Sequence, residues 1–142
     1  MNFNRIARAA CAAVLAVTLI ACLSACSPRT PSGPNGSDRT VVAAPIDDID
    51  ILVRESFPPG YTAHIISGLP SGCALFHDAR ITARDGDSVT ISVTNTVPTD
   101  PEVVCPAIYT FHETNIDLGQ DFVSGRTYTV KVNDEQTTFT AQ

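Results

Sequence analysis

Three histidines, His64, His77 and His112, are the side chains best suited to bind a metal ion or to transfer protons. A zinc site needs ligands at short spacings together with a second anchor, and none of the three stands in an HxH, HxxxH or HExxH pattern. No GxSxG motif indicates a serine hydrolase, and Asp85-Gly86-Asp87 lacks the further ligands of a calcium loop. We therefore predict no catalytic residue, no metal site and no cofactor.

The first 25 residues have the layout of an export signal. Arg5 and Arg8 supply positive charge without any acid, and the run from Ala9 to Leu23 is apolar apart from Thr18. An apolar core of about 15 residues suits a signal peptide and is short for a membrane span, which needs about 20. The following Leu23-Ser24-Ala25-Cys26 resembles the lipobox of bacterial lipoproteins. This resemblance implies that residues 1–25 are removed and that Cys26 carries a lipid.

Other interpretations of the N-terminus remain open. Leu19-Ile20-Ala21-Cys22 is a weaker lipobox match, because Ile20 is bulky for its position and cleavage there leaves Leu23 on the mature end. An ordinary secretory signal and an uncleaved anchor helix are further alternatives. Several acyl chains on Cys26 would hold the protein firmly to a membrane. We expect it on the extracytoplasmic face, at the outer membrane or cell surface, and Ser27 favours the outer membrane where the host has two.

The net charge of the chain limits the classes of partner that it can bind. Removal of residues 1–25 takes away Arg5 and Arg8, so the net charge changes from 9 − 15 = −6 to 7 − 15 = −8. Phosphate binding needs clustered Lys and Arg, which argues against nucleic acid as a partner. Membrane attachment then comes from the lipid and not from a basic patch. A protein or another component of the cell envelope is the remaining kind of partner.

Composition divides the mature chain into two parts. Residues 26–45 are crowded with Pro, Gly, Ser and Asn and nearly free of large apolar side chains. Such a segment buries too little surface to offset its chain entropy, so we predict a flexible tether. Residues 46–142 are expected to form one domain.

Alternation of apolar and polar residues recurs through this domain. Two alternating runs flank Asp85-Gly86, which predicts a β-hairpin. Phe57-Pro58-Pro59-Gly60 and Asn133-Asp134 predict further turns between alternating runs. The predicted strands cover residues 49–53, 61–65, 79–83, 89–93, 103–111, 114–118, 128–132 and 137–141. About seven or eight short strands predict an all-β fold, a small antiparallel Greek-key sandwich of the immunoglobulin-like kind. A small barrel is the alternative.

Two segments resemble known domains. Phe122 to Val132 resembles the final strands of immunoglobulin-like and fibronectin-like domains, in which a glycine-containing loop leads to a tyrosine on an alternating strand. Residues 56–142 are similar to secreted bacterial domains of uncharacterised function that share a GLPSGC stretch and a later VTN…C pattern. This second resemblance implies no particular activity.

Five cysteines divide by position. Cys11 and Cys22 leave with the signal and Cys26 takes the lipid, so Cys73 and Cys105 remain in an oxidising compartment and predict one disulfide. The bond would close a loop of about 33 residues and contribute about 3–4 kcal/mol on the chain-entropy model. A redox or metal-binding pair is the weaker alternative, since no CxxC motif occurs.

Two stretches are the best candidates for binding, because loops held by a rigid scaffold commonly carry function. Residues 67–77 contain Leu69, Phe76 and His77, and residues 109–115 contain Tyr109 and His112. We therefore expect a non-enzymatic binding or envelope-associated module. A peptidase inhibitor that acts through sandwich loops is the alternative, although no NPTTGY-like segment is present. An enzyme ranks third.

Overall fold

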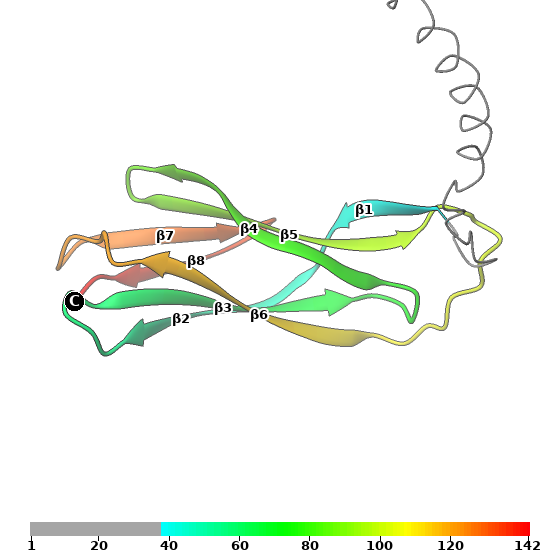
Figure 1. The fold of residues 1–142 in the computed structure, drawn as a ribbon, viewed down its shortest axis with the longest axis horizontal. Helices are drawn as coiled ribbons and strands as arrows, with labels where there is room; N and C mark the ends of the chain where they lie inside the picture. The colour runs from blue at the N-terminus through cyan, green and yellow to red at the C-terminus, as the bar shows by residue number, and fades with distance from the viewer. Residues whose placement is uncertain (1–37) are drawn as a thin grey trace, which may run out of the picture. The chain divides into compact units, whose positions relative to one another are not determined.

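Residues 38–142, the part of the chain that the computed structural model describes, form eight β-strands and no helix. The strands are β1 Arg39–Ala43, β2 Ile46–Arg54, β3 Gly60–Leu69, β4 Leu75–Asp85, β5 Ser88–Pro98, β6 Thr110–Gly119, β7 Thr127–Val132 and β8 Glu135–Thr140. They stack as two layers (Figure 1): sheet A contains β1, β4, β5, β7 and β8, and sheet B contains β2, β3 and β6. The predicted all-β sandwich is confirmed, and because the sheets do not close on each other, the barrel alternative is wrong.

β5 is the centre of sheet A. One of its edges pairs with β4, and its other edge is shared by two strands in succession. β1 pairs with Thr94–Pro98 and β7 with Ser88–Ile91. The β5–β7 pair is parallel, whereas the other strand pairs of the described residues are antiparallel.

The Asn133 side chain fills the gap between β1 and β7 on the edge of β5. Its Oδ1 accepts a hydrogen bond from the Val93 N–H at 3.1 Å, and its Nδ2 donates to the carbonyls of Val93 and Ala44, both at 2.8 Å. The amide therefore replaces one rung of the backbone ladder. Asn133 has φ 51°, a left-handed conformation that asparagine tolerates better than most residues. The predicted turn at Asn133-Asp134 joins β7 to β8.

Inward-facing side chains on alternate positions make the core. On β3, Tyr61, Ala63 and Ile65 are buried while Thr62 and His64 are half-buried on the opposite face. The core consists mainly of small and branched apolar residues with two tyrosines: Ala44, Tyr61, Ala63, Ile65, Val89, Ile91, Val93, Leu118, Tyr128, Val130, Val132 and Ala141. The segment that resembles an immunoglobulin-like end forms β7, on which Tyr128 is buried after Gly125, whose φ is +81°.

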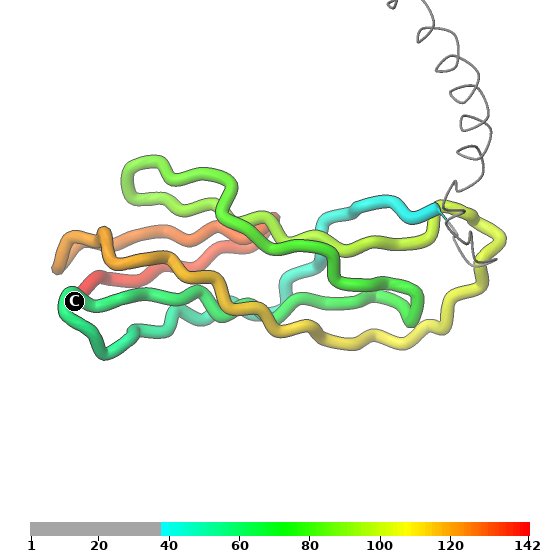
Figure 2. Tube along the Cα trace, viewed as in Figure 1, coloured from blue at the N-terminus to red at the C-terminus, as the bar shows by residue number. Residues whose placement is uncertain are grey.

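Several local predictions are confirmed. Asp85-Gly86 lies at the tip of the β4–β5 hairpin, where Asp85 pairs with Ser88 and Gly86 has φ +54°. At the same end of the sandwich, β2 and β3 are joined through residues 55–59, as the Pro-Pro-Gly sequence predicted. Figure 2 shows the chain turning back at both ends of the long β3.

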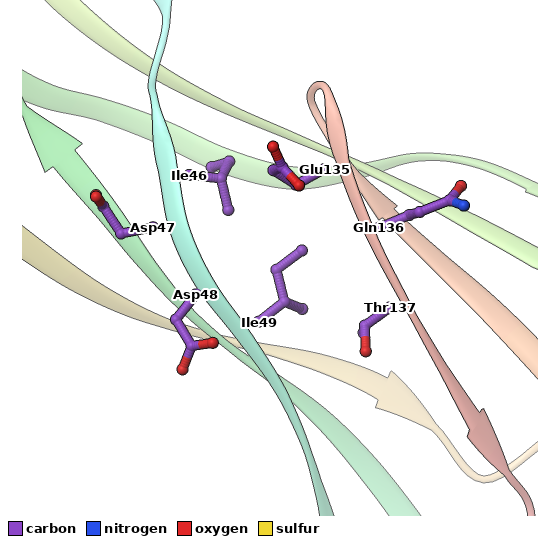
Figure 3. Close-up of a pocket in the computed structure, with 7 residues that line it drawn as sticks. All are labelled: Ile46, Asp47, Asp48, Ile49, Glu135, Gln136 and Thr137. Carbon is purple, nitrogen blue, oxygen red and sulfur yellow. The ribbon is translucent and has the colours of Figure 1, made fainter.

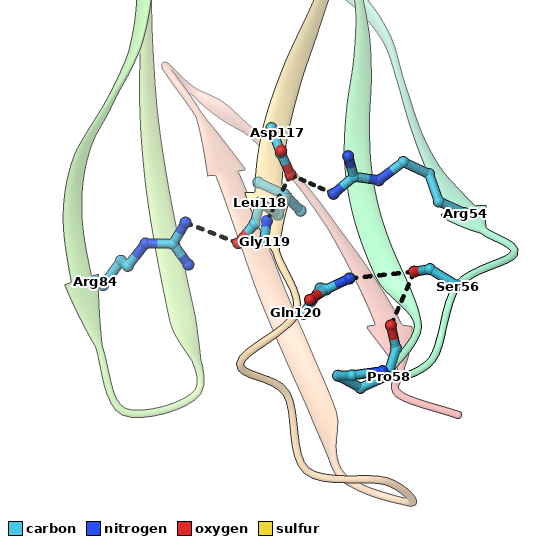
Figure 4. A network of polar contacts seen from close by, with 8 residues as sticks. All are labelled: Arg54, Ser56, Pro58, Arg84, Asp117, Leu118, Gly119 and Gln120. Carbon is cyan, nitrogen blue, oxygen red and sulfur yellow. Dashed lines mark hydrogen bonds and ion pairs between the residues drawn. The ribbon is translucent and has the colours of Figure 1, made fainter.

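Polar contacts hold this end together (Figure 4). Asp117 pairs with Arg54 at 2.7 Å and accepts a hydrogen bond from the Gly119 N–H at 2.8 Å. Arg84 of β4 donates to the Leu118 carbonyl at 2.9 Å and so links sheet A to the open edge of β6. An edge carbonyl satisfied in this way is less available to a foreign strand.

Two predictions need correction. Residues 103–109 are not a strand, because Pro101 and Pro106 lack the N–H donors that a ladder needs; the strand begins at Thr110 and continues to Gly119 without a break. The domain also begins earlier than residue 46. Arg39–Ala43 form β1, an edge strand whose side chains are all exposed and which therefore lacks a buried-face pattern.

The predicted signal peptide, Cys26 and residues 27–37 of the predicted tether lie outside the described residues. Between residues 38 and 142 the structure contains no helix with the length and hydrophobicity that a membrane crossing requires.

Candidate functional site

The Cys73–Cys105 disulfide, predicted from the cysteine positions, is present and braces one end of the sandwich. It joins the β3–β4 turn to the long β5–β6 loop, and the two Cα atoms are 5.4 Å apart. Beside it, the Gly72 N–H donates to the Pro106 carbonyl at 2.9 Å. Arg39 of β1 donates to the Cys73 carbonyl at 2.7 Å. Three segments distant in sequence are thus held together at this end, which we call the disulfide end.

All five predicted binding residues gather at the disulfide end, because β3 ends there and β4 and β6 begin there. They do not form one surface. Phe76 and His112 point inward from β4 and β6 and stack with ring centroids 3.9 Å apart, so they join the two sheets. Leu69 is half-buried, and His77 is exposed on β4. Only Tyr109 lies on the outer face of sheet B.

Tyr109 lies across the outer face of sheet B, from the end of the β5–β6 loop to β2, and we call this side chain with its bond to Asp47 the strap. Its hydroxyl donates to the Asp47 carboxylate, with 2.9 Å to Oδ2 and 3.1 Å to Oδ1. The ring passes directly over Gly68, where an added Cβ would lie 1.8 Å from the hydroxyl oxygen. The hydrogen bond to Asp47 and its negative charge raise the pKa of Tyr109. Because the Tyr109 hydroxyl lies so close to the backbone, only glycine fits at position 68, the first residue of the GLPSGC stretch.

Phe111 extends the strap into an exposed aromatic pair. Its ring meets that of Tyr109 edge-on, with centroids 5.5 Å apart and planes at 71°. The side chain is 63% exposed although it lies opposite Gly68 in the ladder. Phe111 lies inside the predicted stretch 109–115 but is not among its predicted binding residues. Its alternation with the inward-facing His112 was the available signal.

Carboxylates lie beside this aromatic pair on the outer face of sheet B. The next side chain of β3 on this face after Gly68 is Ile66, which is paired with Asp48 of β2 and Glu113 of β6. In the row after that, Asp50 and Asn115 flank His64, whose Nδ1 lies 3.1 Å from the Asn115 Oδ1. The outer face of sheet B therefore combines apolar rings with an acidic rim.

Two buried polar side chains lie beneath this face. Asn95 of β5 is fully buried, and its Nδ2 donates to the Gly68 carbonyl at 2.9 Å. Ser67 is also fully buried and donates to the His112 carbonyl at 3.3 Å. The Asn95 bond holds the backbone beneath Tyr109 to sheet A, whereas the Ser67 bond ties β3 to β6 within sheet B.

A hollow of about 400 Å³ opens between β2 and β8, beside the strap. Figure 3 shows Ile46 and Ile49 in its middle, with Asp47, Asp48 and Glu135 around it. Within residues 38–142 no group of three or more His, Cys, Asp or Glu side chains is arranged to hold a metal ion. Asp47 is moreover already bound to Tyr109.

Comparison with known proteins places this fold in a family. The chain is 34% identical over 89 residues to an uncharacterized 10.2 kDa protein of Herpetosiphon aurantiacus, encoded in the HgiCIIM 5' region, and the match covers 63% of this chain and 90% of that protein. No solved structure matches the chain. The family model of the ORF11 beta-sandwich domain matches residues 63–141, which include β4 to β8 and most of β3. The chain therefore belongs to the ORF11 beta-sandwich domain family.

Proposed function

We propose that this protein is an exported lipoprotein that carries a non-enzymatic binding module on the extracytoplasmic face of a membrane. Residues 1–25 direct export, and Cys26 carries the lipid. The Cys73–Cys105 disulfide supports this location, because structural disulfides are found mainly in oxidising compartments.

The binding surface is the outer face of sheet B near the disulfide end, formed by Ile66, Tyr109 and Phe111; we call it the aromatic face. The observation that carries the proposal is the exposed pair of aromatic rings, Tyr109 and Phe111, on a braced backbone. The Tyr109 hydroxyl is bound to Asp47, the disulfide closes this end of the sandwich, and a buried hydrogen bond holds the Gly68 carbonyl beneath the rings. Rigid exposed aromatic side chains are enriched among the residues that dominate binding energy.

The acidic rim indicates the kind of partner. Asp48, Asp50 and Glu113 border the aromatic face, and the chain as a whole is negatively charged. Charge complementarity favours a cationic protein or envelope component, for which the aromatic rings also offer cation–π contacts.

Site-specific photo-crosslinking in the native host tests the binding surface. A photoreactive phenylalanine analogue at Phe111 should yield a discrete crosslinked product, and the same analogue at Val123 should not. Val123 is a matched control, since its exposure of 61% is close to the 63% of Phe111 and it lies in the β6–β7 loop at the other end of the sandwich.

Charge reversal completes the test. Glu113→Lys should weaken the product at position 111, because it removes part of the acidic rim. Equal products at both positions, or a product unaffected by Glu113→Lys, would show that the aromatic face is not the binding surface. The anchor is tested separately, because Cys26→Ser should release the protein from membranes or block its processing.

A further inference from the structure

The β5–β6 loop carries two exposed apolar side chains at the disulfide end. Val104 is 93% exposed and Ile108 is 57% exposed, although both lie within a few residues of Cys105. The disulfide, the Gly72–Pro106 hydrogen bond and the Ile108 N–H bond to the Pro106 carbonyl at 2.9 Å hold the loop. The exposed side chains therefore sit on a braced loop, where they cannot fold back into the core.

This loop lies where the rest of the chain joins the domain. The Asp38 carbonyl accepts hydrogen bonds from the Thr99 N–H at 2.8 Å and the Thr99 hydroxyl at 2.7 Å, at the start of the loop. The next residue, Arg39, binds the Cys73 carbonyl beside the disulfide. Whatever precedes Asp38 thus leaves the sandwich at the disulfide end.

The length of that segment limits how far this end can be from the anchor. Cys26 precedes Asp38 by 38 − 26 = 12 residues, a stretch that spans at most roughly 40 Å when fully extended. The ten residues of β3 cover about 34 Å from one end of the domain to the other. The disulfide end therefore stays within roughly 40 Å of a lipid on Cys26, whereas the opposite end can lie about 34 Å farther away.

We infer that Val104 and Ile108 insert into the interface of the bilayer that holds the lipid anchor, so that the domain stands on the membrane by its disulfide end. This inference rests on the proposed lipidation of Cys26. Asp38, Asp100 and Glu102 lie in the same region and disfavour a strongly anionic surface, so the lipid in question is zwitterionic. With the disulfide end on the bilayer, the aromatic face points along the membrane plane and stays open to a partner.

The absence of tryptophan from the chain makes a direct test available. The full chain with intact Cys26 and the single substitution Val104→Trp is purified from the host and reconstituted into phosphatidylcholine vesicles. Its emission should move to shorter wavelength, and bromine-substituted phosphatidylcholine should quench it. Both effects should be lost when Cys26→Ser is added to a chain that begins at residue 26 and so lacks the signal segment. The fold should tolerate the tryptophan, because Val104 is almost fully exposed.

Phe57→Trp is the matched control. Phe57 is fully exposed in the β2–β3 loop, at the opposite end of the sandwich, and its tryptophan should keep the emission and quenching of a solvent-exposed side chain. If both variants float with the vesicles but neither changes its emission, the docking inference is wrong while the anchor stands. Equal changes at both positions would likewise overturn it, since the domain would then have no preferred end.

Two further measurements test the lipid anchor by itself and show whether something other than the bilayer covers Val104 and Ile108. Flotation measures the anchor independently, so failure of the Cys26-intact chain to float would overturn the lipid anchor and the docking with it. An emission shift of Val104→Trp already present in the Cys26→Ser chain without vesicles would mean that another part of the chain, or a second copy, covers the loop. Dependence of that shift on protein concentration identifies the second copy, and either result overturns the inference.

Discussion

Replacement of Asn133 tests the most unusual feature of the fold, a side chain that serves as a rung of the sheet. Asn133→Ala removes three hydrogen bonds, two from Nδ2 to the Ala44 and Val93 carbonyls and one from the Val93 N–H to Oδ1. A hydrogen bond of this kind contributes about 1 kcal/mol net, so the three together account for about 3 kcal/mol. Alanine at φ 51° adds at least about 1 kcal/mol of backbone strain.

The expected loss for Asn133→Ala is therefore about 4 kcal/mol of unfolding free energy, a large share of the stability of a small domain. Asn133→Gly removes the same hydrogen bonds but accepts the left-handed backbone, so its loss should be smaller, about 3 kcal/mol. Asp134→Ala, in the same turn and exposed, should cost less than about 0.5 kcal/mol and serves as the control.

Urea unfolding of a fragment spanning residues 37–142, which form one compact unit, measures all three losses by linear extrapolation. The order of loss should be alanine, then glycine, then the Asp134 control. A loss below about 1 kcal/mol for Asn133→Ala would refute the role of the amide as a rung. Wild-type stability in Asn133→Gly would show that only the backbone conformation matters at this position.

Three further predictions concern the disulfide end and the edge of sheet A. The double substitution Cys73→Ala and Cys105→Ala should lower the unfolding free energy by about 3–4 kcal/mol in urea titrations, since the bond closes a loop with a sequence separation of 32; an unchanged midpoint would mean that the hydrogen bonds beside it suffice. Asp47→Asn should lower the pKa of Tyr109 in an ultraviolet titration, because the carboxylate raises it in the wild type. The strap therefore stabilises the fold at pH values below the ordinary pKa of a phenol, and this stabilisation is lost as the pH rises through the raised pKa of Tyr109. Identical titration curves for the wild type and Asp47→Asn would contradict the strap. A fragment that begins at residue 46 should unfold at lower urea concentration than one that begins at residue 37, because it lacks β1 and leaves the edge of β5 open; equal midpoints would show that β1 contributes nothing.

Local patterns were sufficient to predict much of the fold. The alternation around Asp85-Gly86 predicted the β4–β5 hairpin, and turn residues predicted the β2–β3 and β7–β8 connections. These features depend on residues close together in the chain. The pattern failed for β1, because a strand with exposed side chains has no apolar face to alternate. It also failed at residues 103–109, where apolar content suggested a strand that the prolines prevent.

Only part of the candidate site could be predicted from the sequence. Tyr109 and His112 were predicted together, yet one is a strap on the outer face and the other stacks on Phe76 between the sheets. The difference arises because Tyr109 precedes the strand and reaches across Gly68, while His112 occupies an inward position of β6. Neighbours in sequence thus have opposite surroundings.

By itself the sequence determined an all-β domain and one disulfide between Cys73 and Cys105. These conclusions follow from residue type and local spacing. Only the tertiary structure decided that β1 and β7 share one edge of β5, with Asn133 between them, and that Tyr109 meets Asp47 over Gly68. Such contacts join residues from 40 to 89 positions apart. Strand register and sheet stacking, which no local pattern encodes, bring them together.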